Sequence, residues 1–396
     1  MEQWTEIRAA DFIEFNPRMS IKKGTIATKV AMDKLQPFTK KIPDSEKASF
    51  SGGSKFRNGD TIMARITPCL ENGKTAFVDI LGKDEVAFGS TEFIVMRARE
   101  GISDPQFIYY LATSPWFRNI AIKSMVGSSG RQRVQQSVLD DLVLNVPPLE
   151  EQKKISSFLC VLDLKIALNN EINDNLQQQA AAIFRSWFVD CALFGGKAPD
   201  EWENVTLEDI TALVSRGITP KYADDTDQIV INQKCVRNHM IDLSLARTHT
   251  PKVINEKWLR FGDLLINSTG DGTLGRAAQV WFQPKNLTVD SHVTIVRPAK
   301  ENLIFYIGLW GILHEKEIES LHTGSTGQTE LPRDRVKAME LRLPDNDTLD
   351  RFNALITPMA AAIVANQEEN KQLAALRDAI LPKLMSGEIE VSAVQL

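Results

Sequence analysis

The stretch from Pro147 to Asp190 decides the fold, and it reads PPLEEQKKISSFLCVLDLKIALNNEINDNLQQQAAAIFRSWFVD. Two prolines followed by Glu150 and Glu151 suit the first turn of a helix. Proline lacks an N–H that would have no partner there, and carboxylates favour the positive end of the helix dipole. Apolar residues then recur at steps of three and four around two asparagines. The pattern predicts one long helix with a heptad seam and a polar centre.

A second copy of this seam lies 197 residues further along the chain, and the shift takes Asn169 and Asn173 to Asn366 and Asn370. Two long seams with asparagines at the same two places indicate an internal duplication. The predicted seam residues are Ile155, Leu159, Leu162, Ile166, Asn169, Asn173, Leu176, Ile183 and Trp187 in the first copy, and Phe352, Ile356, Met359, Ile363, Asn366, Asn370, Leu373, Ile380 and Leu384 in the second.

An antiparallel pairing of the two helices would bring these asparagines together, although length alone permits either orientation. If facing position numbers sum to 539, Asn169 meets Asn370 and Asn173 meets Asn366. Amide side chains can satisfy one another in such a layer, and a buried polar layer fixes the register at some cost in stability. The alternative is that the asparagines lie at solvent-exposed points of a looser pair.

Two prolines make the second helix different from the first. Pro358 falls about three turns into it, where a proline removes a backbone hydrogen bond and costs roughly 3 kcal/mol. We therefore expect a kink at Pro358, or a first helical segment that ends near Thr357. Pro382 should bend or end the last turn, and Gly387 should stop the helix.

The segments before the two helices resemble each other, which predicts two copies of one mixed domain. Strand-like runs at 61–66, 76–80 and 93–97 are separated by turn residues, and a helix interrupted near Pro115 is expected over 105–124. The matching stretches are Phe56–Asp60 with Leu259–Asp263, Thr91–Arg97 with Ser291–Arg297, Gly127–Gly130 with Gly324–Gly327, and Leu144–Pro147 with Leu341–Pro344.

The expected fold class is α+β (mixed): two similar α/β domains separated by a long antiparallel two-helix coiled coil, with pseudo-twofold symmetry. The expected boundaries are a first domain at 1–146, a first spacer helix at 147–194, a second domain at 195–343 and a second spacer helix at 344–390. The glycine pair at 195–196 followed by a proline marks the end of the first helix.

Composition fits an ordinary globular chain of 396 residues, with 43% hydrophobic and 24% charged residues. No apolar run approaches the roughly 20 residues of a membrane span, and the N-terminus shows no signal peptide. Four scattered cysteines favour a reduced, cytoplasmic setting. The net charge of −5 argues weakly against nucleic-acid binding. Residues 1–148 nevertheless hold 20 basic and 17 acidic side chains, a net +3 (20 − 17).

Motifs for catalysis are missing from the sequence. It contains no P-loop, no H-E-x-x-H and no G-x-S-x-G, and no metal site is expected. All five histidines fall after residue 197, so a site built on them would have no counterpart in the first domain. The run Gly270–Gly275 has loosely the glycine spacing of a phosphate loop, but a strand-like segment follows it, which favours a tight β-turn.

Binding remains, and basic side chains beside polar loops are the candidates for contacts with DNA. Arg and Lys hold phosphates or read base edges in the major groove. Taken singly, each is more simply a solvated surface charge, whereas clusters in matching places of two domains indicate more. The candidates are Lys22, Lys23, Lys55, Arg57, Arg65, Lys74, Arg131 and Arg133 in the first domain, and Arg216, Lys221, Lys234, Arg237, Arg276, Arg333 and Arg335 in the second.

Four stretches are distinctive: Val146–Gln152, Phe184–Asp190, Gly217–Pro220 and Leu381–Ile389. Through them the chain resembles the specificity (S) subunit of a Type I restriction–modification system, over essentially its whole length. The resemblance implies two target-recognition domains, each of which reads one half of a split, asymmetric double-stranded DNA target. It also implies that the helices set the half-site spacing and dock two methyltransferase subunits, with restriction subunits joining the complex.

The resemblance further implies that this subunit has no catalytic activity and binds no cofactor. S-adenosylmethionine would belong to the methyltransferase subunits, and ATP with Mg²⁺ to the restriction subunits. Two other interpretations remain open. One is a coiled-coil scaffold that binds only protein, and the other is an enzyme with duplicated domains. The aromatic group at Phe184, Trp187 and Phe188 exceeds what a seam requires, and we expect it to dock a domain or a partner.

Overall fold

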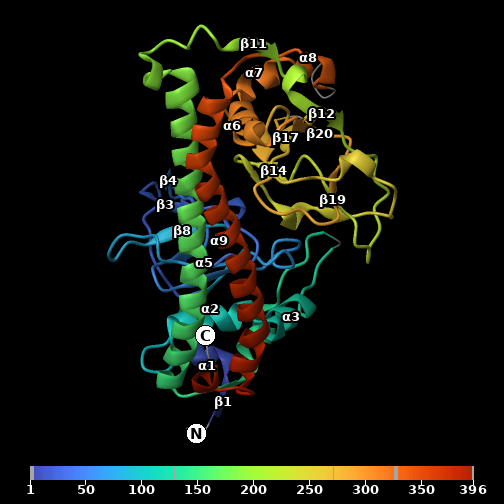
Figure 1. Cartoon of the computed structure of the whole chain (residues 1–396). Coiled ribbons are helices and arrows are strands. Elements are labelled where there is room, and N and C mark those ends of the chain that lie inside the picture. The colour runs from blue at the N-terminus through green and yellow to red at the C-terminus, as the bar shows by residue number, and fades with distance from the viewer. Residues whose placement is uncertain (1–3, 129, 271, 325–328, 395–396) are drawn as a thin grey trace. The chain divides into compact units, whose positions relative to one another are not determined.

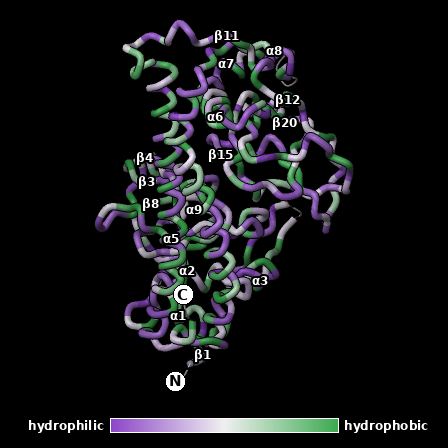
Figure 2. Tube along the Cα trace, viewed as in Figure 1, coloured by the Kyte–Doolittle hydropathy of each residue, from purple (hydrophilic) through white to green (hydrophobic). Residues whose placement is uncertain are grey.

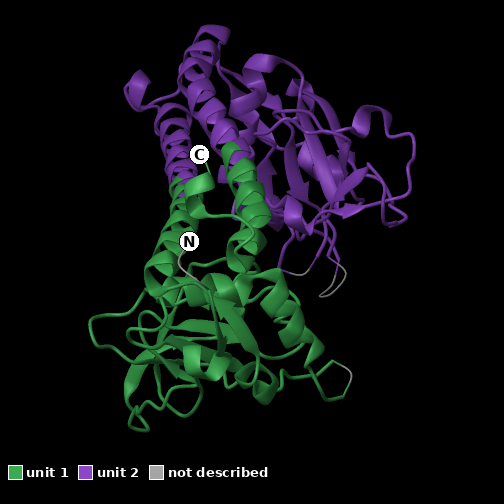
Figure 3. Ribbon diagram, turned by 90° about the horizontal axis from the view of Figure 1, so that it is seen from below, with its two compact units in different colours: residues 1–168, 369–396 green, residues 169–368 purple. Residues whose placement is uncertain are grey.

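The computed structural model describes residues 4–128, 130–270, 272–324 and 329–394. They form two compact units (Figure 3), one made of residues 1–168 and 369–396, the other of residues 169–368. We call them unit 1 and unit 2. Of the matching loops predicted above, Ser129 and 325–327 lie outside the described residues, as does Asp271 of the predicted β-turn. In the described part of the chain, every helix is too short or too polar to cross a membrane.

Two long helices dominate the chain, and each contributes to both units (Figure 1). Helix α5 spans Leu149–Phe184 and passes into a π-helical turn at Arg185–Val189. Helix α9 spans Asn346–Ser386. Hydrophilic and hydrophobic residues alternate along both (Figure 2), as expected of helices with one packed face.

Helix α9 runs through Pro358 without a break, so the predicted end near Thr357 is wrong. Pro358 lies on the exposed side of α9, and so does Ala354, whose carbonyl would have bonded to the missing N–H. Water can therefore satisfy that carbonyl, which lowers the cost of the proline. Pro382 also lies inside the helix, which ends before Gly387, a residue with φ of 75°.

The two helices pair antiparallel within each unit. In unit 1, Arg377 on α9 bonds to Asp163 on α5 over 2.8 Å. In unit 2, the Asn366 side-chain amide donates to the side-chain oxygen Oδ1 of Asn173 over 2.8 Å, which joins two members of the expected asparagine layer. Every predicted seam residue is buried or half-buried.

The domain of unit 1 is mixed helix and strand. Its sheets have the strand orders β2-β9-β6-β7 and β4-β3-β8-β5, and β1 pairs with β10 just before α5. The strands are β1 Thr5–Arg8, β2 Ile13–Phe15, β3 Ile26–Val30, β4 Glu46–Ser49, β5 Lys55–Phe56, β6 Thr61–Ala64, β7 Thr75–Phe77, β8 Ala87–Gly89, β9 Phe93–Ala98 and β10 Val143–Val146. The helices are α1 Ala9–Phe12, α2 Pro105–Thr113, α3 Pro115–Lys123 and α4 Gln136–Asp140.

The domain of unit 2 repeats this topology with one strand fewer in its second sheet. The orders are β12-β20-β17-β18 and β16-β13-β19, and β11 pairs with β21 just before α9. The strands are β11 Glu203–Thr206, β12 Thr211–Arg216, β13 Ile229–Ile231, β14 Val236–Arg237, β15 Met240–Ile241, β16 Arg247–Thr248, β17 Leu264–Asn267, β18 Ala277–Gln279, β19 Leu287–Val289, β20 Val293–Pro298 and β21 Glu340–Leu343. The helices are α6 Ile304–Leu313, α7 Glu315–Ser320 and α8 Arg333–Lys337.

Each domain packs onto the long helices through its own core. In unit 1, Leu159 and Leu384 are fully buried with the domain residues Phe107 and Tyr110. In unit 2, Phe352 and Ile356 pack with domain residues in the same way. Burying such side chains contributes about 1.5–3 kcal/mol each, so each long-helix segment is part of a domain core rather than a free linker.

Candidate nucleic-acid interface

Each domain contains a buried aspartate–arginine pair at the same place in its sheet. Arg97 on β9 donates two bonds of 2.7 Å to the Asp60 carboxylate. Arg297 on β20 donates bonds of 2.8 and 2.7 Å to Asp263. Both aspartates are almost fully buried, at 1% exposure. Separating such a pair is costly, because it leaves an uncompensated charge buried away from water.

The same aspartates fix the turn that precedes β6 in unit 1 and β17 in unit 2. In unit 1 the N–H of Arg57 donates to the buried carboxylate over 2.8 Å, and in unit 2 the N–H of Arg260 does so over 2.8 Å. Gly59 and Gly262 in these turns both have φ of 89°, which favours glycine. Each turn therefore presents one exposed arginine from a rigid base.

The first-domain candidates divide into exposed and structural groups. Lys22, Lys23, Arg57, Arg131 and Arg133 are exposed, whereas Lys55, Arg65 and Lys74 are half-buried. The Lys74 ammonium donates to the Met32 carbonyl over 2.9 Å, and Arg65 donates to the Val134 carbonyl over 3.4 Å. The structure thus gives Arg65 and Lys74 a loop-holding role beside any contact with DNA.

The second-domain candidates divide in the same way. Lys221, Lys234, Arg237, Arg333 and Arg335 are exposed, whereas Arg216 and Arg276 are half-buried. Arg276 donates to the Gly272 carbonyl over 2.7 Å, which braces the turn read from the glycine spacing. Arg335 donates to the Leu321 carbonyl over 3.0 Å.

Each domain has an ion pair at an isolated β-bridge, and the residue at the bridge is basic in one domain and acidic in the other. In unit 1, Arg133 bridges to Ile66 and pairs with Glu92 over 2.6 Å. In unit 2, the equivalent bridge position is Glu330, which pairs with Arg216 over 2.6 Å. The Arg133 guanidinium lowers the pKa of Glu92 by hydrogen bonding. The two domains therefore keep one backbone arrangement and place opposite charges on it.

Sequence reasoning missed a basic and aromatic cluster in unit 2. The Arg247 guanidinium stacks on Tyr222, 3.6 Å from the ring centroid, and Tyr222 is 40% exposed. Lys252 and Lys257 donate to the carbonyls of Thr219 and Gly217. An aromatic residue next to Lys221, within 30 residues of further Lys and Arg, was the signal available in the sequence.

Gly217 is required at this cluster by close packing of the backbone. A Cβ there would lie 1.9 Å from the Val289 carbonyl oxygen. The segment Gly217–Pro220 is thus pressed against β19 at its first residue, and it leads directly to Lys221 and Tyr222.

The aromatic group at the end of α5 docks the domain of its own unit. Phe188 lies 5.0 Å from Tyr306 on α6 and 5.8 Å from Trp202, measured between ring centroids. Phe184 lies 5.6 Å from Tyr306. Of the two expected roles, docking of a domain is the one these contacts supply.

The described residues hold no group of three or more His, Cys, Asp or Glu placed to bind a metal ion. The histidines scatter: His249 is buried against its neighbour's carbonyl, and His239 is exposed beside Glu315. The polar side chains described above form ion pairs or lie on basic loops. Such groups are suited to binding a charged partner.

Comparison with known proteins matches the N-terminal part of the chain to a family. Residues 1–178 match the family described as the Type I restriction modification DNA specificity domain. The HindI specificity subunit of Haemophilus influenzae is 25% identical over 414 residues, covering 84% of this chain and 87% of that protein. The MjaIX specificity subunit of Methanocaldococcus jannaschii is 25% identical, covering 72% and 69%.

Over most of its length the chain is similar to specificity subunits of Type I restriction–modification systems, and residues 1–178 match their DNA specificity domain. A crystal structure of a Type I S subunit from M. genitalium has the same fold, with a TM-score of 0.52 over 97% of this chain and 96% of that chain, at 14% identity. These likenesses support a role in DNA sequence specificity, and each of the two domains carries exposed basic side chains.

Proposed function

We propose that this specificity subunit reads a bipartite, asymmetric double-stranded DNA target, with one half-site for each domain. The observation that carries the proposal is that the two domains share a fold but expose different side chains. Both domains have the same strand order in their first, four-stranded sheet and the same Asp–Arg pair. Base edges are read by individual side chains, so two different sets of exposed residues on one frame select two different half-sites.

The two domains differ in the charged side chains that their loops carry. Arg133 of the first domain corresponds to Glu330 of the second, and the Tyr222–Arg247 stack belongs to the second domain. A palindromic target would require equal surfaces, because a twofold arrangement presents the same residues to each half-site. An asymmetric target follows.

Docking of partner subunits is the second part of the proposal. Helix α5 exposes Val161, Leu164 and Leu168, which are 53, 68 and 51% exposed and lie at steps of three and four on one face. Such a stripe on the outer face of a paired helix suits a further helix from a methyltransferase subunit. We propose two methyltransferase subunits and restriction subunits as partners.

Catalysis belongs to those partners in this proposal. S-adenosylmethionine would be bound by the methyltransferase subunits, and ATP with Mg²⁺ by the restriction subunits. The specificity subunit itself is proposed to be non-catalytic, and the complex to work in the cytoplasm. In support, the Arg297 and Arg216 side chains of two described ion pairs also donate to backbone carbonyls, an arrangement that positions loops.

The proposal is tested with the complex of this chain and its methyltransferase subunits. Lys22→Ala with Lys23→Ala alters the first domain, Lys221→Ala with Arg247→Ala alters the second, and Lys153→Ala on α5 is the control. Each domain variant should relax methylation at one half-site only, with a loss of about 1–3 kcal/mol per lost base contact. Methylome sequencing reports the sites.

Two results would contradict parts of this proposal. Equal weakening at both half-sites by either variant would show that the domains do not read separately. A second test deletes one heptad from each long helix, which should change or abolish recognition of the normal half-site spacing. Unaltered methylation sites would remove the role of the helices in spacing. Binding of protein partners without salt-dependent DNA binding would favour a scaffold.

A further inference from the structure

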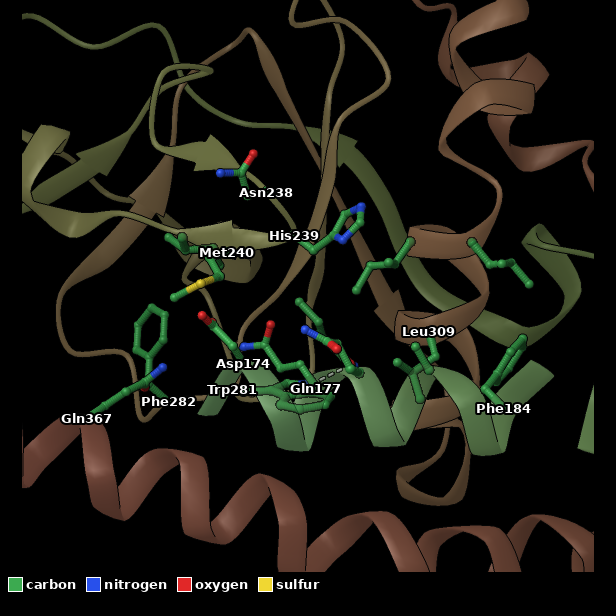
Figure 4. Close-up of a pocket in the computed structure, with 16 residues that line it drawn as sticks. Asp174, Gln177, Phe184, Asn238, His239, Met240, Trp281, Phe282, Leu309 and Gln367 are labelled. Carbon is green, nitrogen blue, oxygen red and sulfur yellow. Dashed lines mark hydrogen bonds between the residues drawn. The ribbon is translucent and has the colours of Figure 1, made fainter. Parts of the chain in front are cut away.

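Unit 2 contains a pocket of about 620 Å³ that no step of DNA recognition uses (Figure 4). It lies between α6, the β14–β15 hairpin and the long-helix segments of that unit. Asp174 and Gln177 extend from α5 on the side that faces Met240 of the hairpin. Pockets of roughly 300–1,000 Å³ are the size that holds small organic ligands.

The walls are mainly aromatic and aliphatic. Trp281, Phe282, Phe184 and Leu309 line the pocket. The Trp281 indole N–H donates to Gln279 over 2.5 Å, which fixes the ring in place. The wall is thus preformed, and a ligand would bury apolar surface without reordering it.

Charge on the pocket wall is acidic. Among the described residues, the ionisable members of the lining are Asp174 and His239, and none of these lining residues is a lysine or arginine. His239 is 3.2 Å from Glu315, so its positive charge is balanced when it is protonated. A carboxylate beside aromatic faces disfavours anions and attracts cations, because the face of an aromatic ring carries negative potential.

The corresponding space in unit 1 is filled by the chain itself. There Tyr110 donates to Asp163 over 2.6 Å, and Arg377 holds Asp163 over 2.8 Å and Asp378 over 2.9 Å. The cavity left beside this network is about 60 Å³. The shift of 197 turns Asp163, Arg377 and Asp378 into Ala360, Ala180 and Ala181, and of these three alanines Ala181 lines the unit 2 pocket.

Unit 1 also places an organic ammonium group against Tyr109 and Tyr110, two of the residues that line its small cavity. The Lys40 ammonium lies 4.6, 5.2 and 5.6 Å from the ring centroids of Tyr110, Tyr109 and Phe77. Its Nζ is 3.1 Å from the Tyr110 hydroxyl oxygen. In unit 1, the protein's own lysine thus supplies an organic ammonium group that packs against aromatic rings.

We propose that the unit 2 pocket binds a small organic cation with an apolar body, held by the Asp174 carboxylate and the aromatic wall. The ligand would tie the β14–β15 hairpin and α6 to the long helices of unit 2. It would thereby stabilise the folded unit by mass action. The inference is independent of the proposed DNA function, because neither DNA nor a partner subunit takes part.

The test measures binding to the full chain by isothermal titration calorimetry with three matched probes. Phenethylammonium is the cation, 2-phenylethanol is its neutral counterpart and phenylacetate is the anion. Phenethylammonium should bind at least about threefold more tightly than 2-phenylethanol, and phenylacetate should bind most weakly. Equal affinity for the cation and the neutral probe, or no binding of phenethylammonium up to about 10 mM, would overturn the proposal.

Two pairs of variants locate the site. Asp174→Asn should weaken phenethylammonium about threefold and leave 2-phenylethanol unchanged, whereas Glu171→Gln on the same helix should change neither. Ala181→Phe should fill the pocket and weaken both probes about tenfold, whereas the adjacent Ala182→Phe should not. Ala181 and Ala182 are both exposed, so both variants should fold, as circular dichroism would check. Equal effects of the two phenylalanines would place binding elsewhere.

Discussion

At the residue scale, both domains use an arginine paired with a buried aspartate, and that aspartate holds a turn. Arg297 makes further contacts, because its guanidinium also donates to the carbonyls of Glu256 and Trp258, each over 2.7 Å. One guanidinium thus joins its strand to two loops. The turns that present exposed arginines are fixed by groups that themselves lie out of the solvent.

Replacing Asp60 with Asn should destabilise unit 1 by about 3–5 kcal/mol, because the Arg97 guanidinium would remain buried without its counter-charge. Urea unfolding followed by circular dichroism measures the loss. Asp263→Asn should do the same to unit 2, and Asp79→Asn, at an exposed position, is the matched control. A loss for Asp60→Asn no larger than that of the control would contradict the role assigned to the pair.

The pH dependence of unit 1 should include a contribution from Glu85. Hydrogen bonds from Lys47, Thr28 and the Gly82 N–H lower the pKa of Glu85 to about 2, from 4.5 in an unstructured chain. A lowered folded-state pKa stabilises the fold above about 4.5, and this stabilisation is lost as pH falls toward about 2.

Glu85→Gln should therefore reduce the free energy of unfolding at pH 7, and the gap to the unaltered chain should close below about pH 3. Urea unfolding at a series of pH values provides the measurement. A gap that stays constant from pH 7 to pH 2.5 would show that the carboxylate charge of Glu85 does not contribute.

At the element scale, the helices were predictable from the sequence and the loops were not. Heptad spacing and two matched asparagines predicted α5, α9 and their antiparallel pairing, because helix packing follows a fixed period. Pro358 misled the prediction of a helix end, since the penalty of a proline depends on whether the freed carbonyl reaches water. The Tyr222–Arg247 stack was missed because residues 25 apart meet only through folding.

The asparagine pair yields a prediction for the helices themselves. Asn366→Leu alone should cost about 1–3 kcal/mol, because the buried side-chain oxygen of Asn173 loses the donor Asn366. Replacing both asparagines with leucine should restore much of that loss, since two apolar side chains satisfy each other. A double-mutant cycle by thermal unfolding decides it, and strictly additive losses would contradict coupling between the two.

At the scale of the whole molecule, unit 1 is discontinuous in sequence and unit 2 is not. Residues 369–396 supply Ile380, Leu381 and Leu384 to a core whose other members lie before residue 168. The domain boundaries predicted from the sequence, at the ends of the long helices, remain a prediction. Each compact unit of the structure contains a part of both long helices.

Removing residues 369–396 should therefore expose the core of unit 1 and leave that of unit 2 intact. Hydrogen–deuterium exchange should show lost protection of amides in 149–168, while those in 264–267 and 293–298 stay protected. A variant with Leu384→Ala is a milder control, with an expected cost of about 2–5 kcal/mol. Uniform loss of protection over both units would contradict their independence.

The order in which the ribosome makes these segments has a consequence for the cell. Between residue 168 and residue 369 lies all of unit 2, 200 residues (368 − 169 + 1), which take roughly 10–40 s to translate. For that time Ile155 and Leu159 have no partner from α9, while unit 2 can complete itself. We expect nascent chains to recruit chaperones at this stage. Chains stalled at residue 368 should be cleaved by protease within 149–168, and released chains should resist.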